Sequence, residues 1–479
     1  MRLEEIELET PYLKLEGEFY DFVEPIPLEN PQLISFNPNV AKLIGLDEAS
    51  LDLKQLIELL NGKWMPKGAR AHSMCYAGHQ FGHYAPRLGD GRAINIGAID
   101  GWNLQLKGSG ETLYSRMADG RTATPSSIRE YLVSEAMFHL GIPTTRALAI
   151  IGSDTKIVRN SIENAAIVMR MSTSWVRFGT FEYFYYTKQY DKLEQLAEYV
   201  IAESYPHLQN DEDRFYKMFS EIVDNTAKLV AQWQAIGFCH GVMNTDNMSV
   251  AGATIDYGPF AFLDDFNYGH VCNNTDKAGR YSYAEQPNIS YWNLTKLSKA
   301  LSPIISPQKM QKKLDDYGSF IYKNIYVAIM KDKLGLFTEQ KEDETLIEEL
   351  IGALQESFVD YTLFFRTLSR YDGDRMPLFE ITMNPIELDK WLNIYDNRLE
   401  KEKVDLTQRQ EFMLKKNPKY VLKNYLLQNA IEKSLQGDNS MIETLLYIAA
   451  HPYDELPEFE EYAKETPENY KNIALTCSS

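Results

Sequence analysis

The chain has 479 residues, of which 44% are hydrophobic and 24% are charged, an ordinary composition for a soluble globular protein. Its net charge of −19 argues against nucleic acid and anionic membranes as partners. No apolar run approaches the ~18–20 residues that span a bilayer. The acidic residues 1–7 form neither a secretory signal nor a basic transit peptide, so we expect a cytoplasmic protein.

The first part of the chain is expected to build a small, strand-rich unit. Residues 1–75 mix acidic positions with proline-containing turns and indicate an N-terminal extension that packs on the strands after it. Alternating apolar residues on both sides of Asp100-Gly101, a strong tight-turn signal, predict a β-hairpin over 92–107. Lys107 falls on the face of the return strand opposite the apolar residues, where a cleft could lie. The alternative for this residue is a solvated surface lysine.

A helix is predicted after this hairpin. Thr124 is a good N-cap, Pro125 suits the first turn, and Gly141 marks the end of the helix. Glu130 lies near the start of the helix, and its carboxylate is the candidate partner of Lys107. A capping-box role is the structural alternative for Glu130.

The remainder of the chain is predicted to be mainly helical. Apolar positions at helical spacing predict a helix over 215–236, which leads into a loop that begins at His240. Further helices are expected over 291–301, 346–368 and 420–435. No repeat, linker or low-complexity segment separates these regions.

The loop from His240 to Asn247, with the triplet Asp256-Tyr257-Gly258, resembles the catalytic loop and metal-binding triplet of the protein-kinase superfamily. In the kinase pattern H-R-D-x-x-x-x-N, the Asp accepts the substrate proton and the Asn binds metal. Asn247 is in place here, whereas Val242 occupies the position of the base and cannot take a proton. Asp246 supplies a carboxylate next to Asn247. The chain therefore has metal–nucleotide ligands without the usual base for phosphoryl transfer.

Several other residues could supply the positive charge and the close backbone contacts that a nucleotide needs. The turn Gly89-Asp90-Gly91 offers backbone amides, and Arg92 adds charge beside it. Arg170 and Arg177 could clamp phosphates, and Asp119-Gly120 forms a second acidic turn. Taken alone, each of these has an ordinary alternative as a turn or surface residue.

The resemblance extends to one particular family. Long segments of the chain are similar to the selenoprotein O (YdiU) family, across nearly the whole sequence and most densely over 76–300. The matching segments are Tyr76–Gly82, Gln105–Gly110, Ser126–Glu130, His240–Asn247, Ile255–Phe260, Gly279–Tyr281, Gln286–Pro287, Trp292–Leu294 and Asn417–Pro418. This resemblance implies a protein adenylyltransferase that transfers AMP from ATP, with UMP from UTP as a variant, to Ser, Thr or Tyr hydroxyls of proteins and releases pyrophosphate.

The resemblance also implies an architecture. The expected fold is α+β and protein-kinase-like, with a β-rich small lobe, a helical large lobe and a C-terminal helical extension. The expected parts are the N-terminal extension 1–75, the small lobe 76–175, the large lobe with the catalytic loop 176–330, and the helical C-terminal region 331–479. A monomer is expected.

The same resemblance implies the roles of individual residues. Nucleotide contacts are implied for Gly89, Gly91, Arg92, Lys107, Asp119, Gly120, Arg170, Arg177 and Asp256. Asn247 and Asp256 are implied as ligands of Mg²⁺ or Mn²⁺, for which their oxygen atoms are suited. Asp246 is the implied base, and Glu130 is the implied partner of the lysine.

The four cysteines show no C-x-x-C spacing, so a zinc site is not expected. Cys272 follows the metal triplet, and Cys477 is third from the end. One hypothesis is a disulfide between these two residues that restrains the segment after the triplet. The alternative is two separate thiols in a reducing cytoplasm.

Two other functions stay open at this point. A phosphotransferase would use the same ligands but needs a base in place of Val242. A nucleotide-binding pseudokinase scaffold would need no base at all, but the intact Lys107, Asn247 and Asp256 disfavour it.

Overall fold

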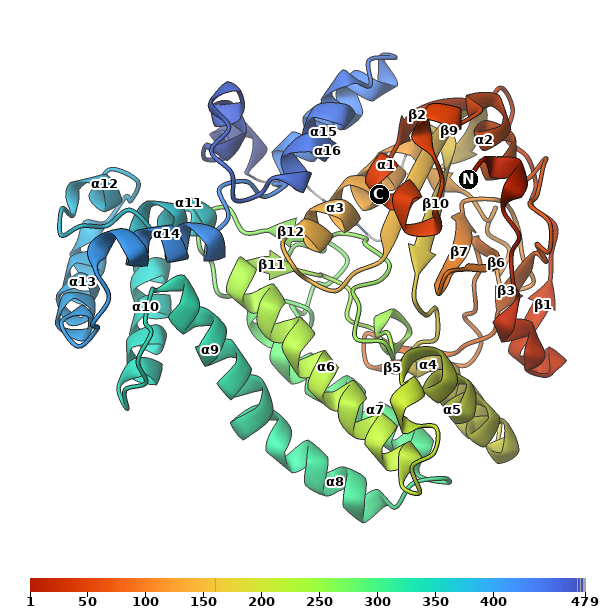
Figure 1. The fold of residues 1–479 in the computed structure, drawn as a ribbon, viewed down its shortest axis with the longest axis horizontal. Helices are drawn as coiled ribbons and strands as arrows, with labels where there is room; N and C mark the ends of the chain where they lie inside the picture. The colour runs from red at the N-terminus through yellow and green to blue at the C-terminus, as the bar shows by residue number, and fades with distance from the viewer. Residues whose placement is uncertain (160, 472, 474, 477–479) are drawn as a thin grey trace.

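The computed structural model describes residues 1–159, 161–471, 473, 475 and 476. The described chain is a mixed α/β protein, with an antiparallel sheet on one side and most of the helices on the other (Figure 1). Within the described residues the sheet has eight strands in the order β1-β3-β6-β7-β10-β9-β2, and β8 pairs with β10. They are β1 (Tyr20–Phe22), β2 (Gln32–Phe36), β3 (His72–Met74), β6 (Ala93–Ile99), β7 (Trp102–Lys107), β8 (Thr122–Ala123), β9 (Arg146–Val158) and β10 (Ile162–Ser172).

Both edges of this sheet come from the start of the chain. β1 pairs with β3 at one edge, and β2 pairs with β9 at the other. The N-terminal residues therefore belong to the same sheet as the later strands. Two short strand pairs lie outside it, β4 (Gly78–Gln80) with β5 (His83–Ala85) and β11 (Phe238–Cys239) with β12 (Ala261–Phe262).

The predicted β-hairpin is confirmed by β6 and β7. Asp100 and Gly101 connect the two strands with φ angles of 50° and 80°, which a tight hairpin turn of this type requires. Lys107, at the end of β7, pairs in register with Ala93 of β6 and with Val168 of β10. This register places Lys107 in the middle of the sheet.

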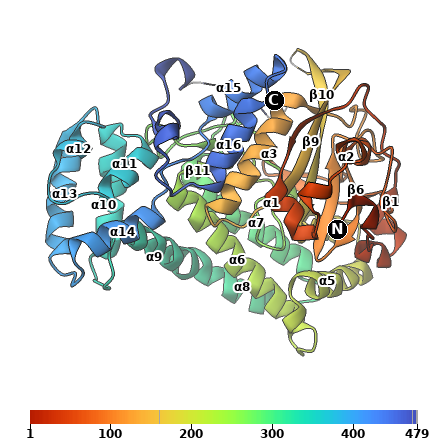
Figure 2. The same cartoon turned by 45° about the horizontal axis from the view of Figure 1, so that its top comes forward.

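The helix predicted after the hairpin is α3 (Thr124–His139), but it does not begin as predicted. Ala123 occupies the N-cap position, and Thr124 is the first helical residue, whose hydroxyl donates to Asn164 O at 3.0 Å. The prediction of Thr124 as N-cap is wrong because β8 pairs with β10, so the chain passes from strand directly into helix. Most of α3 is buried, and α16 (Ser440–Ala450) lies beside it (Figure 2).

The helices of the second half agree with the predictions except where one is divided. The helix predicted over 215–236 is confirmed as α6 (Arg214–Ile236), and the segment 346–368 forms α10 (Asp343–Ser357) and α11 (Tyr361–Leu368) with a break between them. Phe358 ends α10 because it adopts φ of 50°, outside the helical region. The remaining α-helices of the described chain are α1 (Pro38–Ala41), α2 (Leu53–Leu60), α4 (Phe178–Tyr186), α5 (Tyr190–Ser204), α7 (Gln286–Leu301), α8 (Pro307–Asp316), α9 (Lys323–Lys333), α12 (Met376–Phe379), α13 (Pro385–Leu399), α14 (Leu406–Lys416) and α15 (Asn424–Leu435).

The apolar core has three parts. The largest lies between one face of the sheet, α3 and α6, and it continues into α15 and α16. A second fills the space among α9, α10, α11 and α13, and a third covers the other face of the sheet beneath α1 and α2. In the part of the chain that the structure describes, no helix combines the length and the apolar character that crossing a bilayer requires.

Candidate nucleotide-transfer site

A cavity of about 890 Å³ opens where β6, β7 and β10 meet the loop that holds Asp246 and Asn247. Glu130 does not line this cavity but lies behind Lys107, to which it is bonded. The predicted site residues that do line it are Gly89, Gly91, Arg92, Lys107, Asp119, Gly120, Arg170, Arg177, Asp246, Asn247 and Asp256. The structure thus brings all predicted site residues to one place, while their individual roles stay predictions.

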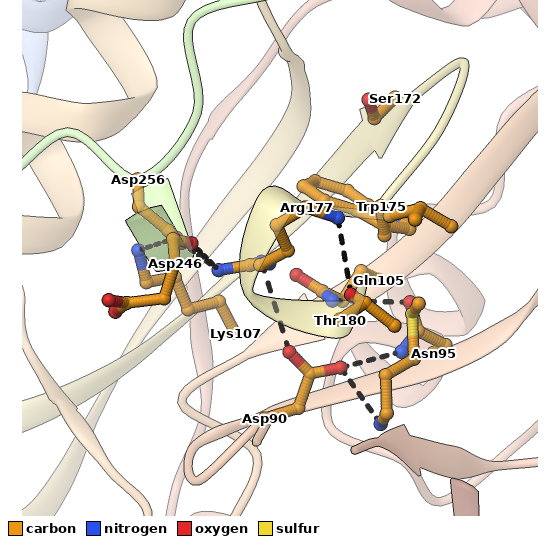
Figure 3. A network of polar contacts seen from close by, with 12 residues as sticks. Asp90, Asn95, Gln105, Lys107, Ser172, Trp175, Arg177, Thr180, Asp246 and Asp256 are labelled. Atoms are coloured by element: carbon orange, nitrogen blue, oxygen red, sulfur yellow. Dashed lines mark hydrogen bonds and ion pairs between the residues drawn. The ribbon is translucent and has the colours of Figure 1, made fainter. Parts of the chain in front are cut away.

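Asp256 accepts hydrogen bonds from three cationic side chains of this cavity, and Figure 3 shows it beside Lys107 and Arg177. Its Oδ1 accepts hydrogen bonds from Lys107 Nζ at 3.0 Å and from Arg170 Nη1 at 2.6 Å. Its Oδ2 accepts from Arg177 Nη1 at 2.6 Å. Asp256 also adopts φ of 57°, a left-handed conformation that is uncommon outside glycine and is often found at functional sites.

Glu130 completes the cluster from α3. Its carboxylate lies 2.8 Å from Lys107 Nζ and accepts from Arg170 Nη1 at 2.7 Å. Burial alone would raise the pKa of Asp256, but the three cations around it outweigh burial and hold that pKa well below its usual value. Burial is likewise outweighed at Glu130, whose pKa is lowered by Lys107 and Arg170. Both carboxylates are therefore ionised and act as the counter-ions of the cationic side chains.

Asp90 lies on another side of Arg177 and is absent from the predicted site residues. Its Oδ1 is 3.9 Å from Arg177 Nη2, and its Oδ2 accepts from Asn95 Nδ2 at 3.0 Å. Burial raises the pKa of Asp90 in spite of the nearby guanidinium. A Cβ atom on Gly89, whose φ is 62°, would lie 2.1 Å from the Tyr114 ring, so the turn requires glycine. The sequence signal for Asp90 is its place inside that turn.

Asp119 and Gly120 also line the cavity. The Nη1 and Nη2 atoms of Arg159 donate to the two carboxylate oxygens of Asp119, each at 2.8 Å. These hydrogen bonds lower the pKa of Asp119. A Cβ atom on Gly120 would lie 2.1 Å from Gly110 O, so the loop also requires glycine. Arg159 carries no sequence signal, because its partner is 40 positions away.

Asp246 is buried against a strand of the short β4–β5 pair. Gln80 Nε2 donates to its Oδ2 at 3.3 Å, while Oδ1 is buried without a hydrogen-bond partner among the described residues. Burial raises the pKa of Asp246 to about 7, although Arg177 lowers it in part. A Cβ atom on Gly78 would lie 2.5 Å from Asp246 Oδ1, so glycine allows this close approach. A carboxylate with such a pKa can accept a proton near neutral pH.

Two other side chains of the loop, those of His240 and Asn247, lie against backbone carbonyl groups of the loop and of the segment after it. His240 is buried, its Nε2 is 3.3 Å from Ile255 O, and burial lowers its pKa to about 4, so it is neutral. Asn247 Nδ2 donates to Val242 O at 3.0 Å, and its side-chain oxygen has no hydrogen-bond partner within the described chain. No group of three or more His, Cys, Asp or Glu among the described residues is arranged to hold a metal ion. The assignment of Asn247 and Asp256 as metal ligands stays a prediction.

Cys272 lies beside Cys239 in the interior. The two sulfur atoms are 3.4 Å apart, and Cys272 Sγ donates to Pro259 O at 2.8 Å. Burial raises the pKa of Cys272 well above its usual value. Cys477 lies outside the described residues, so the hypothesis of a disulfide to Cys272 stays a prediction.

The sequence is similar to a family of known proteins over most of its length. The profile of a family described as "Protein adenylyltransferase SelO" matches residues 2–449. The chain belongs to this family. It is 42% identical over 484 residues to the protein nucleotidyltransferase YdiU of Pseudomonas aeruginosa (strain LESB58), covering 100% of this chain and 99% of the relative.

Relatives from other bacteria give the same result. The protein nucleotidyltransferase YdiU of Thiobacillus denitrificans is 43% identical over 489 residues, with 100% of this chain and 99% of the relative covered. That of Thioalkalivibrio sulfidiphilus is 44% identical over 491 residues, with both chains fully covered. The predicted family is confirmed. SelO family membership identifies the chain as an enzyme that transfers nucleotides.

Proposed function

We propose that the chain transfers AMP from ATP, or UMP from UTP, to Ser, Thr or Tyr hydroxyl groups of proteins. The observation that carries this proposal is the cluster of Lys107, Arg170 and Arg177 around Asp256 at the cavity, in a chain with net charge −19. Such a cluster supplies locally the positive charge that a triphosphate needs. Family membership makes the transferred group a nucleotide rather than a phosphoryl group.

The arrangement of the chain supports a kinase-like reading of the fold. We propose a small lobe over 76–175, extended by 1–75, a large lobe over 176–330 and a helical region from 331 to the end. The ion pair between Lys107 of the sheet and Glu130 of α3 supports this proposal, because kinases pair the same residue types from a strand and a helix.

The proposed reaction forms one bond and breaks another at the α-phosphorus. The substrate hydroxyl oxygen attacks this atom, and the bond to the bridging oxygen of the β-phosphate breaks, so that pyrophosphate leaves with the electron pair. Asp246 takes the hydroxyl proton, which its buried, unpartnered Oδ1 and its pKa of about 7 favour. Lys107, Arg170 and Arg177 stabilise negative charge on the phosphates.

The residues present fit a divalent ion. Asn247 and Asp256 offer the hard oxygen atoms that Mg²⁺ or Mn²⁺ prefers, and the side-chain oxygen of Asn247, which has no hydrogen-bond partner among the described residues, supports this assignment. Mg²⁺ commonly binds through one or two protein oxygens together with substrate phosphates, so a larger acidic cluster is not needed. When bound, such an ion would neutralise charge on the phosphates.

ATP labelled at the α- or the γ-phosphorus tests the reaction. After incubation with a protein substrate, we expect the α-label to stay on the protein and the γ-label to leave as pyrophosphate. Retention of the γ-label alone would show a phosphotransferase, and retention of neither label with any divalent metal, despite ATP binding, would show a nucleotide-binding scaffold. Intact-mass analysis with ATP or UTP identifies the group transferred.

The role of Asp246 needs its own variant. Asp246→Asn keeps the shape of the side chain but removes its basicity, so we expect the turnover number to fall by about 100-fold or more. ATP binding, measured by titration calorimetry, should change little because Asp246 is not placed on the phosphates. An unchanged turnover number would remove Asp246 from the role of base.

A further inference from the structure

A second cavity, of about 320 Å³, lies outside the nucleotide cavity and shares none of its lining residues. It forms where the C-terminal ends of α6, α9 and α14 meet the segment after α3 and the turn at Tyr453. α6 and α9 lie side by side there (Figure 1). Its volume is at the low end of the range for small-molecule sites, which is roughly 300–1,000 Å³.

Lys333, at the end of α9, is a buried lysine that lines this cavity. The residue is 4% exposed. Its Nζ lies 4.0 Å from the centroid of the Phe365 ring and 5.6 Å from that of Tyr361, and within the described chain it has no carboxylate partner and no hydrogen-bond acceptor. Burial lowers the pKa of Lys333 to about 7, and a bound anion would favour its charged form. Aromatic faces offset only part of the cost of burying an ammonium ion, so an anion bound in the cavity would stabilise the charged form of Lys333.

The surroundings of Lys333 are also positively charged. Lys415 and Lys416 line the same cavity, and Asp332 is the one carboxylate among the described lining residues. That carboxylate is already engaged, since Lys416 Nζ donates to it at 2.7 Å. Three amino groups and one carboxylate give this cavity a local excess of positive charge in a chain of net charge −19.

The helix dipole offers a simpler explanation for a lysine at the end of α9. A cation near the C-terminus of a helix is favoured by the helix dipole. The carbonyl groups at these ends are, however, largely bonded to other groups: Lys333 O accepts from Asn417 Nδ2 at 2.8 Å, and Leu140 O accepts from Tyr453 Oη at 3.3 Å. The ammonium group itself faces aromatic rings rather than carbonyl oxygens. The dipole therefore favours the charge without satisfying it.

The remaining walls define the body of the ligand. Leu140, Ile142 and Ile236 are buried apolar residues that line the cavity. Gln232 Nε2 donates to Gly141 O at 3.1 Å, which leaves Gln232 Oε1 buried and without a partner in the described residues. An occupant should hence have an apolar body and a hydrogen-bond donor as well as a negative charge.

We propose that this cavity binds a small organic carboxylate that carries a hydrogen-bond donor. The carboxylate pairs with Lys333, the apolar body packs against Leu140, Ile142 and Ile236, and the donor bonds to Gln232 Oε1. A carboxylate fits better than a phosphate because no arginine lines the described cavity and a single lysine amino group is buried in it. The proposal does not depend on the reaction at the nucleotide cavity.

Titration calorimetry of the full chain tests the proposal with three probes that share an aromatic ring. Para-hydroxyphenylacetate has the carboxylate and the donor, phenylacetate lacks the donor, and para-cresol lacks the carboxylate. We expect one equivalent of para-hydroxyphenylacetate to bind about tenfold or more tightly than para-cresol, the effect of one charge-assisted hydrogen bond. The affinity for phenylacetate should lie between those for the other two probes. Saturating ATP should not displace the probe.

Lys333→Met should weaken the binding of para-hydroxyphenylacetate by about tenfold or more, because the substitution removes the charge and keeps the length of the side chain. Lys341→Met is the matched control, since Lys341 is exposed and forms no ion pair among the described residues. Three results would overturn the proposal. They are equal affinities of the Lys333→Met variant and the wild type for para-hydroxyphenylacetate, displacement of this probe by ATP, and no binding of any probe by the wild type.

Labelling of the wild type keeps the test independent of how well the variant folds. Reductive methylation followed by peptide mass spectrometry measures the reactivity of each lysine with and without para-hydroxyphenylacetate. We expect the probe to slow methylation of Lys333 and to leave Lys341 unaffected. Unchanged methylation of Lys333 at saturating probe would place the ligand elsewhere and refute the site.

Discussion

Replacing Glu130 by glutamine tests whether the buried charge cluster is held together by its acids. The substitution removes one negative charge and nearly preserves the shape of the side chain. Glu130 is 3% exposed and bonds both Lys107 and Arg170 at distances between 2.7 and 3.1 Å. Without its charge, Asp256 is the carboxylate left in contact with both cations.

The magnitude follows from the burial of the pair. Removing one partner of a buried ion pair typically costs about 3–5 kcal/mol, because the other charge stays buried without compensation. Glutamine keeps one hydrogen-bond acceptor, so we expect about 3 kcal/mol of lost stability. For a chain of this size that corresponds to a fall of roughly 3 °C in the midpoint of thermal unfolding. Calorimetry without nucleotide, at neutral pH, measures this change.

A matched control is available on α10. Glu348 is an exposed helical glutamate that forms no ion pair among the described residues, so Glu348→Gln should leave the unfolding midpoint within about 1 °C of the wild type. The Glu130→Gln variant should also release pyrophosphate more slowly, because Lys107 loses one of its two anchors. An unfolding midpoint for Glu130→Gln equal to that of the control would refute the electrostatic reasoning.

Three further variants address separate features. Asp256→Ala should abolish transfer because Lys107, Arg170 and Arg177 lose their common partner; intact-mass analysis of a protein substrate checks this, and transfer at the wild-type rate would contradict it. Gly78→Ala should slow pyrophosphate release by about tenfold or more, since its Cβ would lie 2.5 Å from Asp246 Oδ1; Gly352→Ala, where a Cβ meets open space, is the control and should be neutral. Burial raises the pKa of Glu203 to about 7 in the folded protein, so a neutral carboxyl group favours the folded state. This contribution to the free energy of unfolding is fully present below the pKa of Glu203 in the unfolded chain, and it is lost as the pH rises through about 7. Glu203→Gln should therefore gain stability relative to the wild type between about pH 6 and pH 8 in urea unfolding, and an equal difference at both pH values would exclude Glu203 as the cause.

Local sequence signals predicted the elements whose structure is set locally. The hairpin turn at Asp100-Gly101 depends on two residues that tolerate positive φ, and the helix α6 depends on the spacing of its own apolar residues. The start of α3 depends instead on the pairing of β8 with β10. For this reason the sequence predicts Thr124 as the N-cap, whereas in the structure Thr124 is the first helical residue.

The same division applies to the site. Lys107, Asn247 and Asp256 lie in motifs that are recognisable from their own neighbours, and the structure places all three at one cavity. Asp90 and Arg159 were not predicted because their roles arise from partners distant in sequence: Arg177 for the first and Asp119 for the second. Lys333 illustrates the same limit, since burial of a lysine at the end of a helix depends on the elements that cover it.

The charge balance of the cluster links folding to nucleotide binding. Both oxygens of Asp256 accept hydrogen bonds from cations, so a divalent ion at this carboxylate would compete with Lys107, Arg170 or Arg177. Triphosphate oxygens are stronger competitors for the two guanidinium groups, because they offer more charge in a geometry that arginine matches. Entry of the nucleotide would thus free an oxygen of Asp256 at the same time as it brings the phosphates that complete the ligand set. On this reasoning, Asp256, which balances these cations in the chain without nucleotide, would become available to a metal ion once the nucleotide is bound.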